Sequence, residues 1–388
     1  MRTIWPFIFN ALLFAGFAFV VPFMVLYYQS VGFTGAQIGL LTGITPLITL
    51  LGAPLWTTLA DATRRHRLIM SLVILAGAIT IFTFPFLNTF APILMVAILF
   101  NAFFAPLTSF VDSATMFMLG DKKEQYGRVR LGGTFGFGIA APLAGVLVQT
   151  YGLKMAFWGC AILLLMALIV SQKLAHNPQK ASDTTGQGVR TLVTNPRWLL
   201  FLAVAFAGGL GIAGTNTYLF PYLKELGASE SIMGLALTLG TIFEIPVLFF
   251  GYRLLHRFKP YGLYMLAMVL TGLRLLAFAA SGTPNLVLFI QLLNGLTFPA
   301  MWMAGVAYAD EHAPAGLSTA AQGMFGAMVF GFGTAVGGFI GGPLLDNLGG
   351  SGLYLVFGGI VLVIVAIAAL VQWLLPAEPK KSPTVAMN

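Results

Sequence analysis

Three ionisable side chains lie well inside long apolar stretches of this sequence: Asp112, Glu244 and Arg274. A charge placed in hydrocarbon costs roughly 2.5 to 3.5 kcal/mol on insertion scales, so such residues are usually retained for a function. Arg130 begins the apolar stretch that follows Asp112, and on an antiparallel hairpin its guanidinium could hold that carboxylate in a bidentate pair. These residues could bind a polar solute or carry a proton within a membrane. An ion pair that only locks the hairpin is the alternative.

The composition points to a bilayer as the solvent. Of 388 residues, 58% are hydrophobic and only 8% are charged, a balance that water-soluble proteins of this size do not show. A stretch of about 20 apolar residues is long enough to cross roughly 30 Å of hydrocarbon. The sequence therefore predicts an all-α membrane protein with twelve transmembrane helices, near residues 5–28, 37–60, 68–88, 91–118, 130–150, 155–175, 197–222, 231–252, 261–281, 284–309, 317–345 and 352–375. The first stretch has no small-residue cleavage site, so we expect a retained helix rather than a signal peptide.

The chain repeats itself at about half its length, which predicts two pseudo-symmetric six-helix bundles. Three segments match: Leu26-Tyr27-Tyr28 with Pro221-Tyr222-Leu223 and Gly136-Phe137-Gly138 with Gly331-Phe332-Gly333, both at an offset of 195, and Asn101 and Pro106 with Asn294 and Pro299 at an offset of 193. We expect bundles over residues 1–175 and 197–376, a polar linker over 176–196 and a polar tail over 377–388. Duplicated membrane halves usually enclose a substrate path between them.

The basic residues predict the orientation of the chain. Of the 20 Lys and Arg residues, 17 fall on one side of the membrane when the amino terminus is placed in the cytoplasm. This positive-inside bias predicts that both termini, the linker and the tail are cytoplasmic, in the cell (inner) membrane. Because the basic residues lie in alternate loops, they argue against a nucleic-acid partner despite the net charge of +8. The single Cys160 has no partner for a disulfide within the chain.

Glycines recur every fourth residue in two places, at Gly35, Gly39 and Gly43 and at Gly333, Gly337 and Gly341. Such a run removes side chains from one helix face and lets a neighbouring helix approach closely. We expect these smooth faces either to pack statically or to slide over one another.

Motifs of soluble enzymes are missing. Residues 209–214 match the dinucleotide pattern G-x-G-x-x-G, but they lie in a membrane span without a preceding strand. The sequence has no P-loop, no H-E-x-x-H and no G-x-S-x-G. We therefore expect no enzyme, no cofactor and no metal, so that any energy must come from a gradient. Asp310, Glu311 and His312 could form a metal site or a proton relay, but a hydrated loop start also explains them.

One block of the first half resembles a known family. Val111-Asp112-Ser113-Ala114, followed by residues 125–137 (QYGRVRLGGTFGF), is similar to the fourth and fifth helices of lactose permease and its relatives. These include oligosaccharide:proton symporters, phenylpropionate permeases and nucleoside:proton symporters of the major facilitator superfamily. The resemblance implies twelve helices in two bundles, substrate contacts for Asp112 and Arg130, and stacking of Phe137 on a sugar-like ring.

The segment from Pro54 to Asp61, with Arg64, Arg65 and Arg67 after it, is similar to the signature loop of that superfamily. The resemblance implies that Asp61 and Arg65 brace the cytoplasmic side in one conformation, as a gate. This chain departs from the pattern at Thr57, where the family usually has glycine. A solvated loop with positive-inside arginines is the alternative.

In the second half, Glu244-Ile245-Pro246 and Leu273-Arg274-Leu275 resemble the buried glutamate and arginine that take part in proton coupling in lactose permease. The resemblance implies a proton-carrying role for Glu244 with Arg274 as its partner; a permanent structural ion pair is the alternative. Where lactose permease has a histidine and a glutamate, this chain has Asn294 and Thr297, neither of which binds a proton at ordinary pH. The closer likeness is to the phenylpropionate-like and uncharacterised branches.

We expect a secondary transporter, most simply a monomer in the lipid bilayer, that moves a small solute together with a proton. Polar and aromatic side chains inside the spans suit a ring-bearing, hydrogen-bonding solute such as a sugar, a nucleoside or an aromatic acid. The expected substrate contacts are Asp112, Arg130, Phe137, Asn101, Asn294, Trp302 and Gln322. Alternatives are a proton-coupled exporter of drugs or metabolites, an uncoupled facilitator and a transporter-like sensor or scaffold, with an intramembrane enzyme last.

Overall fold

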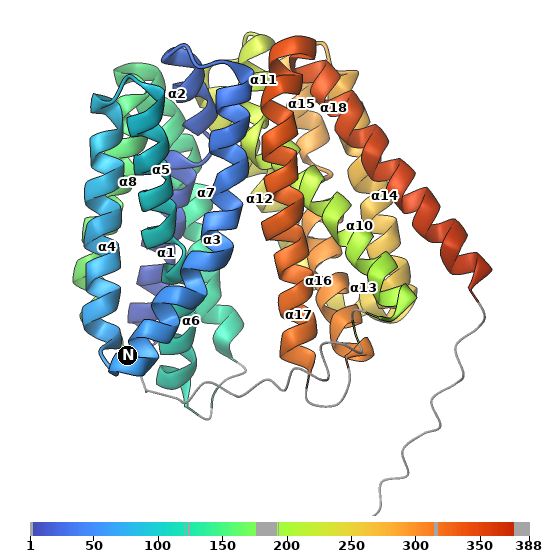
Figure 1. Cartoon of the computed structure of the whole chain (residues 1–388), viewed down its shortest axis with the longest axis horizontal. Helices are drawn as coiled ribbons and strands as arrows, with labels where there is room; N and C mark the ends of the chain where they lie inside the picture. The colour runs from blue at the N-terminus through green and yellow to red at the C-terminus, as the bar shows by residue number, and fades with distance from the viewer. Residues whose placement is uncertain are drawn as a thin grey trace, which may run out of the picture.

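The computed structural model describes residues 3–120, 122, 125–175, 192, 194–313 and 317–375, and within these ranges it contains helices and no strands (Figure 1). The first half comprises α1 (Ile4–Val20), α2 (Met24–Ser30), α3 (Gly35–Thr63), α4 (His66–Thr83), η1 (Phe84–Phe86), α5 (Phe90–Phe104), α6 (Pro106–Leu119), α7 (Tyr126–Tyr151) and α8 (Lys154–Ser171). The second half comprises α10 (Pro196–Ile212), η3 (Ala213–Thr217), α11 (Leu219–Glu225), α12 (Glu230–Phe249), α13 (Gly251–Phe258), α14 (Pro260–Ala279), α15 (Pro284–Gln291), α16 (Asn294–His312), α17 (Ser318–Gly326), η4 (Ala327–Gly333) and α18 (Thr334–Leu374).

In the described part of the chain, 11 helical segments are long and apolar enough to cross a membrane. Ten of them coincide with the first ten predicted spans. The last, Ala320–Leu374, has 55 residues and would be about 80 Å long as one straight helix, far more than a bilayer needs. Gly349 breaks it with φ 68° and ψ 179°, and Figure 1 shows α18 turning back on itself at one end of the molecule. The two last predicted spans therefore lie on either side of this turn.

The predicted repeat is visible in the hydrogen bonds of two tyrosines. The Tyr27 hydroxyl lies 2.9 Å from the carbonyl oxygens of Phe84 and Leu87. The Tyr222 hydroxyl, 195 positions later, lies 2.6 and 2.7 Å from the carbonyl oxygens of Phe278 and Ser281. Each tyrosine joins the end of one helix to the end of another in its own half. The same local structure has thus been built twice from sequences that share few residues.

The turn after each of these tyrosines repeats as well. Gly32 and Gly227 both have positive φ, 86° and 82°, a conformation that favours glycine. The helix that follows each turn is capped by a hydroxyl, since Thr34 accepts a hydrogen bond from the Gln37 N–H and Ser229 accepts one from the Ile232 N–H. The turn chemistry therefore sets where α3 and α12 begin.

The two halves meet closely between α3 and α18. A Cβ added to Gly43 would lie 2.4 Å from the Phe339 ring, and one added to Gly342 would lie 2.2 Å from the Gly35 carbonyl oxygen. The first glycine run is therefore part of the interface between the halves. The second run packs within its own half instead, because the nearest atoms to Gly333, Gly337 and Gly341 belong to Phe206, Ala213 and Tyr218.

Polar contacts join the halves at the same place. The Gly35 N–H donates to Oδ2 of Asp346 at 3.0 Å, so a carboxylate of the second half caps α3 of the first. The Tyr218 hydroxyl lies 3.0 Å from Thr42 Oγ1 and donates to the Gly338 carbonyl at 2.7 Å. A second interface joins α7 to α12, where a Cβ on Gly234 would lie only 2.5 Å from the Ala141 carbonyl oxygen.

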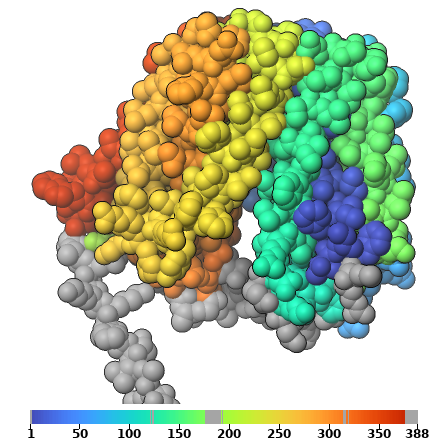
Figure 2. Space-filling view, turned by 180° about the vertical axis from the view of Figure 1, so that it is seen from behind, coloured from blue at the N-terminus to red at the C-terminus, as the bar shows by residue number. Residues whose placement is uncertain are grey.

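All these contacts lie toward one end of the molecule. We call the opposite end, which carries residues 64–67, 125–128 and 253–259, the basic end. Figure 2 shows α12 in yellow and α7 in teal meeting at the top and separating below, with a hollow between them that opens toward the basic end. The structure is therefore closed at one end and open at the other.

Candidate functional site

Arg274 of α14 is buried, with 3% of its surface exposed. Its Nη1 donates to Asn294 Oδ1 at 2.7 Å and to Thr297 Oγ1 at 3.0 Å, and its Nη2 donates to Gln291 Oε1. The guanidinium carbon also lies 5.2 Å from the centroid of the Phe278 ring. Three neutral oxygens and a ring face thus surround the positive charge where α15 passes into α16.

Asn294 connects Arg274 to Glu244. Its Nδ2 donates to Glu244 Oε1 at 2.7 Å, while its Oδ1 accepts from the arginine. The orientation of this amide is determined by its partners, because a guanidinium can only donate and a carboxylate can only accept. No ion pair between Glu244 and Arg274 is found among the described residues. Where a direct pair was predicted, the structure places an amide between the two charges.

Arg130 of α7 is the arginine enclosed among the helices of the first half, although the repeat does not relate it to Arg274. Its Nη1 donates to Asn10 Oδ1 of α1 at 3.1 Å, and its guanidinium carbon lies 4.4 Å from the Phe14 ring centroid. Asn10 is 1% exposed, and its own Nδ2 donates to the Pro6 carbonyl. The arginine is half-buried. The hydrogen bond printed for Arg130 therefore goes to α1 and not to the predicted carboxylate partner, Asp112.

Asp112 of α6 is half-buried, and the polar groups that act on it are Tyr126 and Arg130 of α7. Its Oδ1 is enclosed and has no hydrogen-bond partner in the described part of the chain. The structure thus brings Asp112 and Arg130 into one neighbourhood without a bidentate pair. An unused acceptor oxygen next to a half-buried arginine is an arrangement that a polar solute could complete.

The predicted aromatic contacts come from opposite halves. Phe137 is a half-buried residue of α7, one to two turns beyond Arg130. The ring centroid of Trp302 in α16 lies 5.1 Å from that of Phe325 and 5.0 Å from that of Phe330. Trp302 therefore belongs to an aromatic cluster of the second half. These rings lie on helices of both bundles, as a site between the bundles requires.

Asn101 and Gln322 occupy other environments. Asn101 Nδ2 donates to the Ala97 carbonyl at 2.8 Å and lies 3.4 Å from Thr45 Oγ1, so it holds α5 against α3. Gln322 of α17 donates to Ser318 Oγ at 3.1 Å, one turn from the start of its helix near the basic end. The seven predicted substrate residues are therefore not gathered in one cluster.

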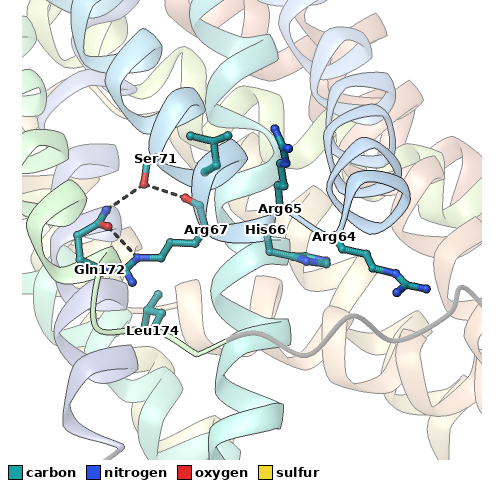
Figure 3. A pocket seen from close by; sticks show the side chains of 8 residues that line it. Arg64, Arg65, His66, Arg67, Ser71, Gln172 and Leu174 are labelled. Atoms are coloured by element: carbon teal, nitrogen blue, oxygen red, sulfur yellow. Dashed lines mark hydrogen bonds between the residues drawn. The ribbon is translucent and has the colours of Figure 1, made fainter.

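The predicted gate residues lie at the basic end. Asp61 Oδ1 is 2.7 Å from His66 Nε2, so histidine rather than Arg65 is the hydrogen-bond partner shown for this carboxylate. Arg65 precedes α4 and lines a cavity of about 590 Å³ between the start of α4 and the end of α8 (Figure 3). We call this cavity the arginine pocket; its lining is Arg64, Arg65, His66, Arg67, Leu68, Ser71, Gln172 and Leu174. It lies outside the space between the halves.

Sequence reasoning missed three contributors. Asn10, which holds Arg130, stood out only as a polar residue in an apolar stretch. Tyr126, which acts on Asp112, lies one turn before Arg130 in the quoted block, and this spacing could have placed it on the same face. Nothing in the pattern distinguished His66 as the partner of Asp61.

Comparison with known proteins places the chain among transporters. Residues 6–356 match the MFS_1 like family. The uncharacterized transporter YwbF of Bacillus subtilis is 27% identical, covering 95% of this chain and 92% of its own length. The maltose permease of Geobacillus stearothermophilus is 26% identical, covering 92% and 91%. The probable 3-phenylpropionic acid transporter of Escherichia coli is 25% identical, covering 76% and 79%.

Solved structures show the same fold. The nucleoside transporter NupG superposes with a TM-score of 0.84 at 19% identity, covering 96% of this chain and 99% of its own. A bacterial homolog of the human lysosomal transporter Spinster, in an inward-facing and unoccupied conformation, gives a TM-score of 0.74 at 16% identity, covering 96% of each chain. The predicted fold class is confirmed, and the relatives are transporters rather than enzymes. This chain is a member of the MFS_1 like family, within the major facilitator superfamily of membrane transporters.

Proposed function

We propose that this transporter moves a small, polar, ring-bearing solute together with a proton, by alternating access between its two bundles. The relatives point to this substrate class, because maltose, nucleosides and phenylpropionic acid all contain a ring. The structure is closed at one end and hollow toward the basic end, which is the arrangement of one state in such a cycle. With the basic end in the cytoplasm, as the positive-inside rule favours, this state would face inward.

One observation carries the proton-coupling part of the proposal: Asn294 stands between Glu244 and Arg274. In a buried direct ion pair, protonating the carboxylate would leave an uncompensated guanidinium, which costs several kcal/mol. Here the guanidinium keeps three neutral oxygen acceptors whether Glu244 is charged or not. Glu244 can therefore gain and lose a proton while Arg274 stays solvated by the protein.

The first half supplies the solute contacts in this proposal. Among the described residues, Asp112 has an acceptor oxygen without a partner, and Arg130 makes one hydrogen bond. A solute hydroxyl could donate to the carboxylate while another accepts from the guanidinium. Phe137 from this half and Trp302 from the other would then pack against the ring faces of the solute.

Transport in proteoliposomes tests the proposal. Candidate solutes are first found by screening sugars, nucleosides and aromatic acids for those that raise the unfolding temperature of the purified protein. For a solute that binds, Glu244→Gln should leave counterflow exchange intact and abolish uphill accumulation driven by an imposed proton gradient. The matched control is Glu230→Gln, because this acid lies on the same helix and binds Lys224 at an exposed position.

Three results would contradict the proposal. Accumulation that survives in Glu244→Gln would remove this residue from coupling. Accumulation on the side with the lower pH would indicate antiport rather than symport. Transport whose rate and final extent do not depend on the pH gradient would indicate an uncoupled facilitator.

A further inference from the structure

The arginine pocket carries more positive charge than the gate role of Asp61 and Arg65 uses. Arg64, Arg65 and Arg67 all line it. The nearby carboxylate of Asp61 is engaged by His66. No ion pair to the three arginines is found among the described residues. The pocket therefore has three cationic side chains without an ion-pair partner among the described residues.

The pocket also lies at the start of α4. The residue that precedes this 18-residue helix, Arg65, makes no side-chain capping bond, and the first turn contains no acidic residue. A helix N-terminus carries a partial positive charge on its free N–H groups. The dipole of α4 thus adds to the three arginines instead of opposing them, and the combined field favours an anion.

One arginine is held in place before any ligand arrives. Arg67 Nε donates to Gln172 Oε1 at 2.9 Å, and Gln172 Nε2 donates to Ser71 Oγ at 2.9 Å (Figure 3). These bonds join α4 to the residue that follows α8 and orient the guanidinium of Arg67 through its Nε. Its two terminal nitrogens make no hydrogen bond within the described residues. A planar fork of this kind matches two oxygens of a phosphate group.

Apolar surface leads away from the pocket. On α4, four side chains spaced as on one helix face are exposed, namely Leu68 (57%), Leu72 (48%), Leu75 (44%) and Ile79 (56%). On α8, which packs against α4, a matching row is exposed, namely Ile162 (58%), Leu165 (45%) and Ile169 (71%). Both helices are membrane spans, so these rows face lipid. A soluble anion would use the arginines alone, whereas a lipid would use the arginines and the rows together.

We propose that the arginine pocket binds the phosphate-bearing headgroup of an anionic phospholipid, with its acyl chains along the exposed rows of α4 and α8. Basic pockets between membrane helices are known to recognise such headgroups, since each Lys or Arg near a charged membrane surface contributes to attraction. The site is separate from the path between the two bundles. The solute need not be known to test it.

The experiment measures lipid binding to the purified full-length protein. Retained lipid is counted by native mass spectrometry while phosphatidylglycerol or phosphatidylcholine is titrated in. The natural protein should retain phosphatidylglycerol in preference to phosphatidylcholine. The triple variant Arg64→Gln, Arg65→Gln, Arg67→Gln should bind phosphatidylglycerol on the order of 100-fold more weakly, from about fivefold for each arginine lost.

A matched control separates this site from the general charge of the basic end. Arg253→Gln, Arg257→Gln and Lys259→Gln remove three charges from the other half at the same end, and this variant should keep its preference for phosphatidylglycerol. If the control loses as much binding as the pocket variant, the attraction is diffuse and the site is wrong. Displacement of the lipid by inorganic phosphate at equal concentration would overturn the lipid in favour of a soluble anion.

A further variant guards against failure to fold. The triple Arg→Lys variant at the same three positions keeps the charge that orients the chain but loses the planar fork. It should fold and bind phosphatidylglycerol several-fold more weakly than the natural protein. If the Arg→Gln variant folds, as judged by its unfolding temperature, and binds phosphatidylglycerol unchanged, the proposal fails.

Discussion

Each half of the molecule holds one arginine in its apolar interior, but the two arginines are held to different degrees. Arg130 is half-buried and, within the part of the chain that the structure describes, has one hydrogen bond, to Asn10. Arg274 is 3% exposed and has three acceptors. Each guanidinium also lies near a phenylalanine ring, at 4.4 Å for Phe14 and 5.2 Å for Phe278.

This difference separates two tasks. Both terminal nitrogens of Arg274 donate to protein oxygens, although its buried Nε has no partner among the described residues. Because this guanidinium is enclosed by the protein, Arg274 is suited to holding a constant charge beside Glu244. A guanidinium with one bond to the protein has donors to offer, so Arg130 is suited to a partner that arrives and leaves. The repeat does not relate the two arginines, because the offset of 195 pairs Arg274 with Ile79 and Arg130 with Phe325. Each half has therefore placed its arginine independently.

Replacing each arginine should give the largest difference between the two halves. Arg274→Leu should destabilise the folded protein by about 3–5 kcal/mol, because it leaves several buried polar groups without their partner. Arg130→Leu should cost less than half as much, while abolishing solute binding. Unfolding in a denaturing detergent measures the first effect and equilibrium solute binding the second. Equal destabilisation by both changes would show that the two arginines are held alike.

The asparagines related by the repeat sharpen the comparison. Asn294 lies between two charges, whereas Asn101 bonds only neutral oxygens. Asn294→Leu should reduce uphill accumulation at least about tenfold, which corresponds to about 1.4 kcal/mol. Asn101→Leu should cost about 1 kcal/mol of stability and leave coupling intact. Accumulation assays on both variants, at matched expression, would refute the bridging role if they gave equal losses.

A smaller effect is expected from the phenylalanines of the repeated Gly-Phe-Gly segment. Phe137→Leu should raise the KM for transport by about 2-fold to 12-fold, because ring stacking contributes about 0.5–1.5 kcal/mol. Phe332→Leu, at the related and half-exposed position of the second half, should leave KM unchanged. Initial-rate measurements distinguish the two, and an equal rise in both would indicate a packing effect rather than solute contact.

The smallest effect should be identical in the two halves. Tyr27→Phe and Tyr222→Phe each remove one hydroxyl that bonds two carbonyl oxygens. Each should cost about 0.5–1.5 kcal/mol of stability and leave transport unchanged. The free energies of unfolding of the two variants should agree with each other. A large difference between them would mean that the two hydroxyls contribute unequally to stability although they make equivalent hydrogen bonds.

The architecture could be predicted because it depends on averages over many residues. Membrane spans follow from long apolar runs, and the repeat follows from matches such as Tyr27 with Tyr222, whose hydroxyls turn out to make the same bonds. Buried charges also stand out in sequence, because hydrocarbon makes them rare. Asp112, Glu244 and Arg274 were found in this way, and their roles stay predictions.

The partners of these charges could not be predicted, because they depend on the rotation of whole helices about their axes. A rotation of a fraction of a turn decides whether Arg130 bonds Asp112 or Asn10, and whether Asn294 faces the solute path or the space between two charges. The second glycine run shows the same limit. Its spacing predicts a smooth face, but only the packed structure shows that this face lies against α10 and Tyr218 in its own half.

The bond from Gly35 to Asp346 bears on how easily the closed end can part. When the bundles separate there, the hydrogen bond between the Gly35 N–H and the Asp346 carboxylate is broken, but bulk water can hydrate both groups. The net loss is then on the order of 1 kcal/mol, close to the thermal energy. This hydrogen bond therefore contributes little to the stability of the closed end. A solute bound with modest affinity would be able to shift the equilibrium between the two conformations.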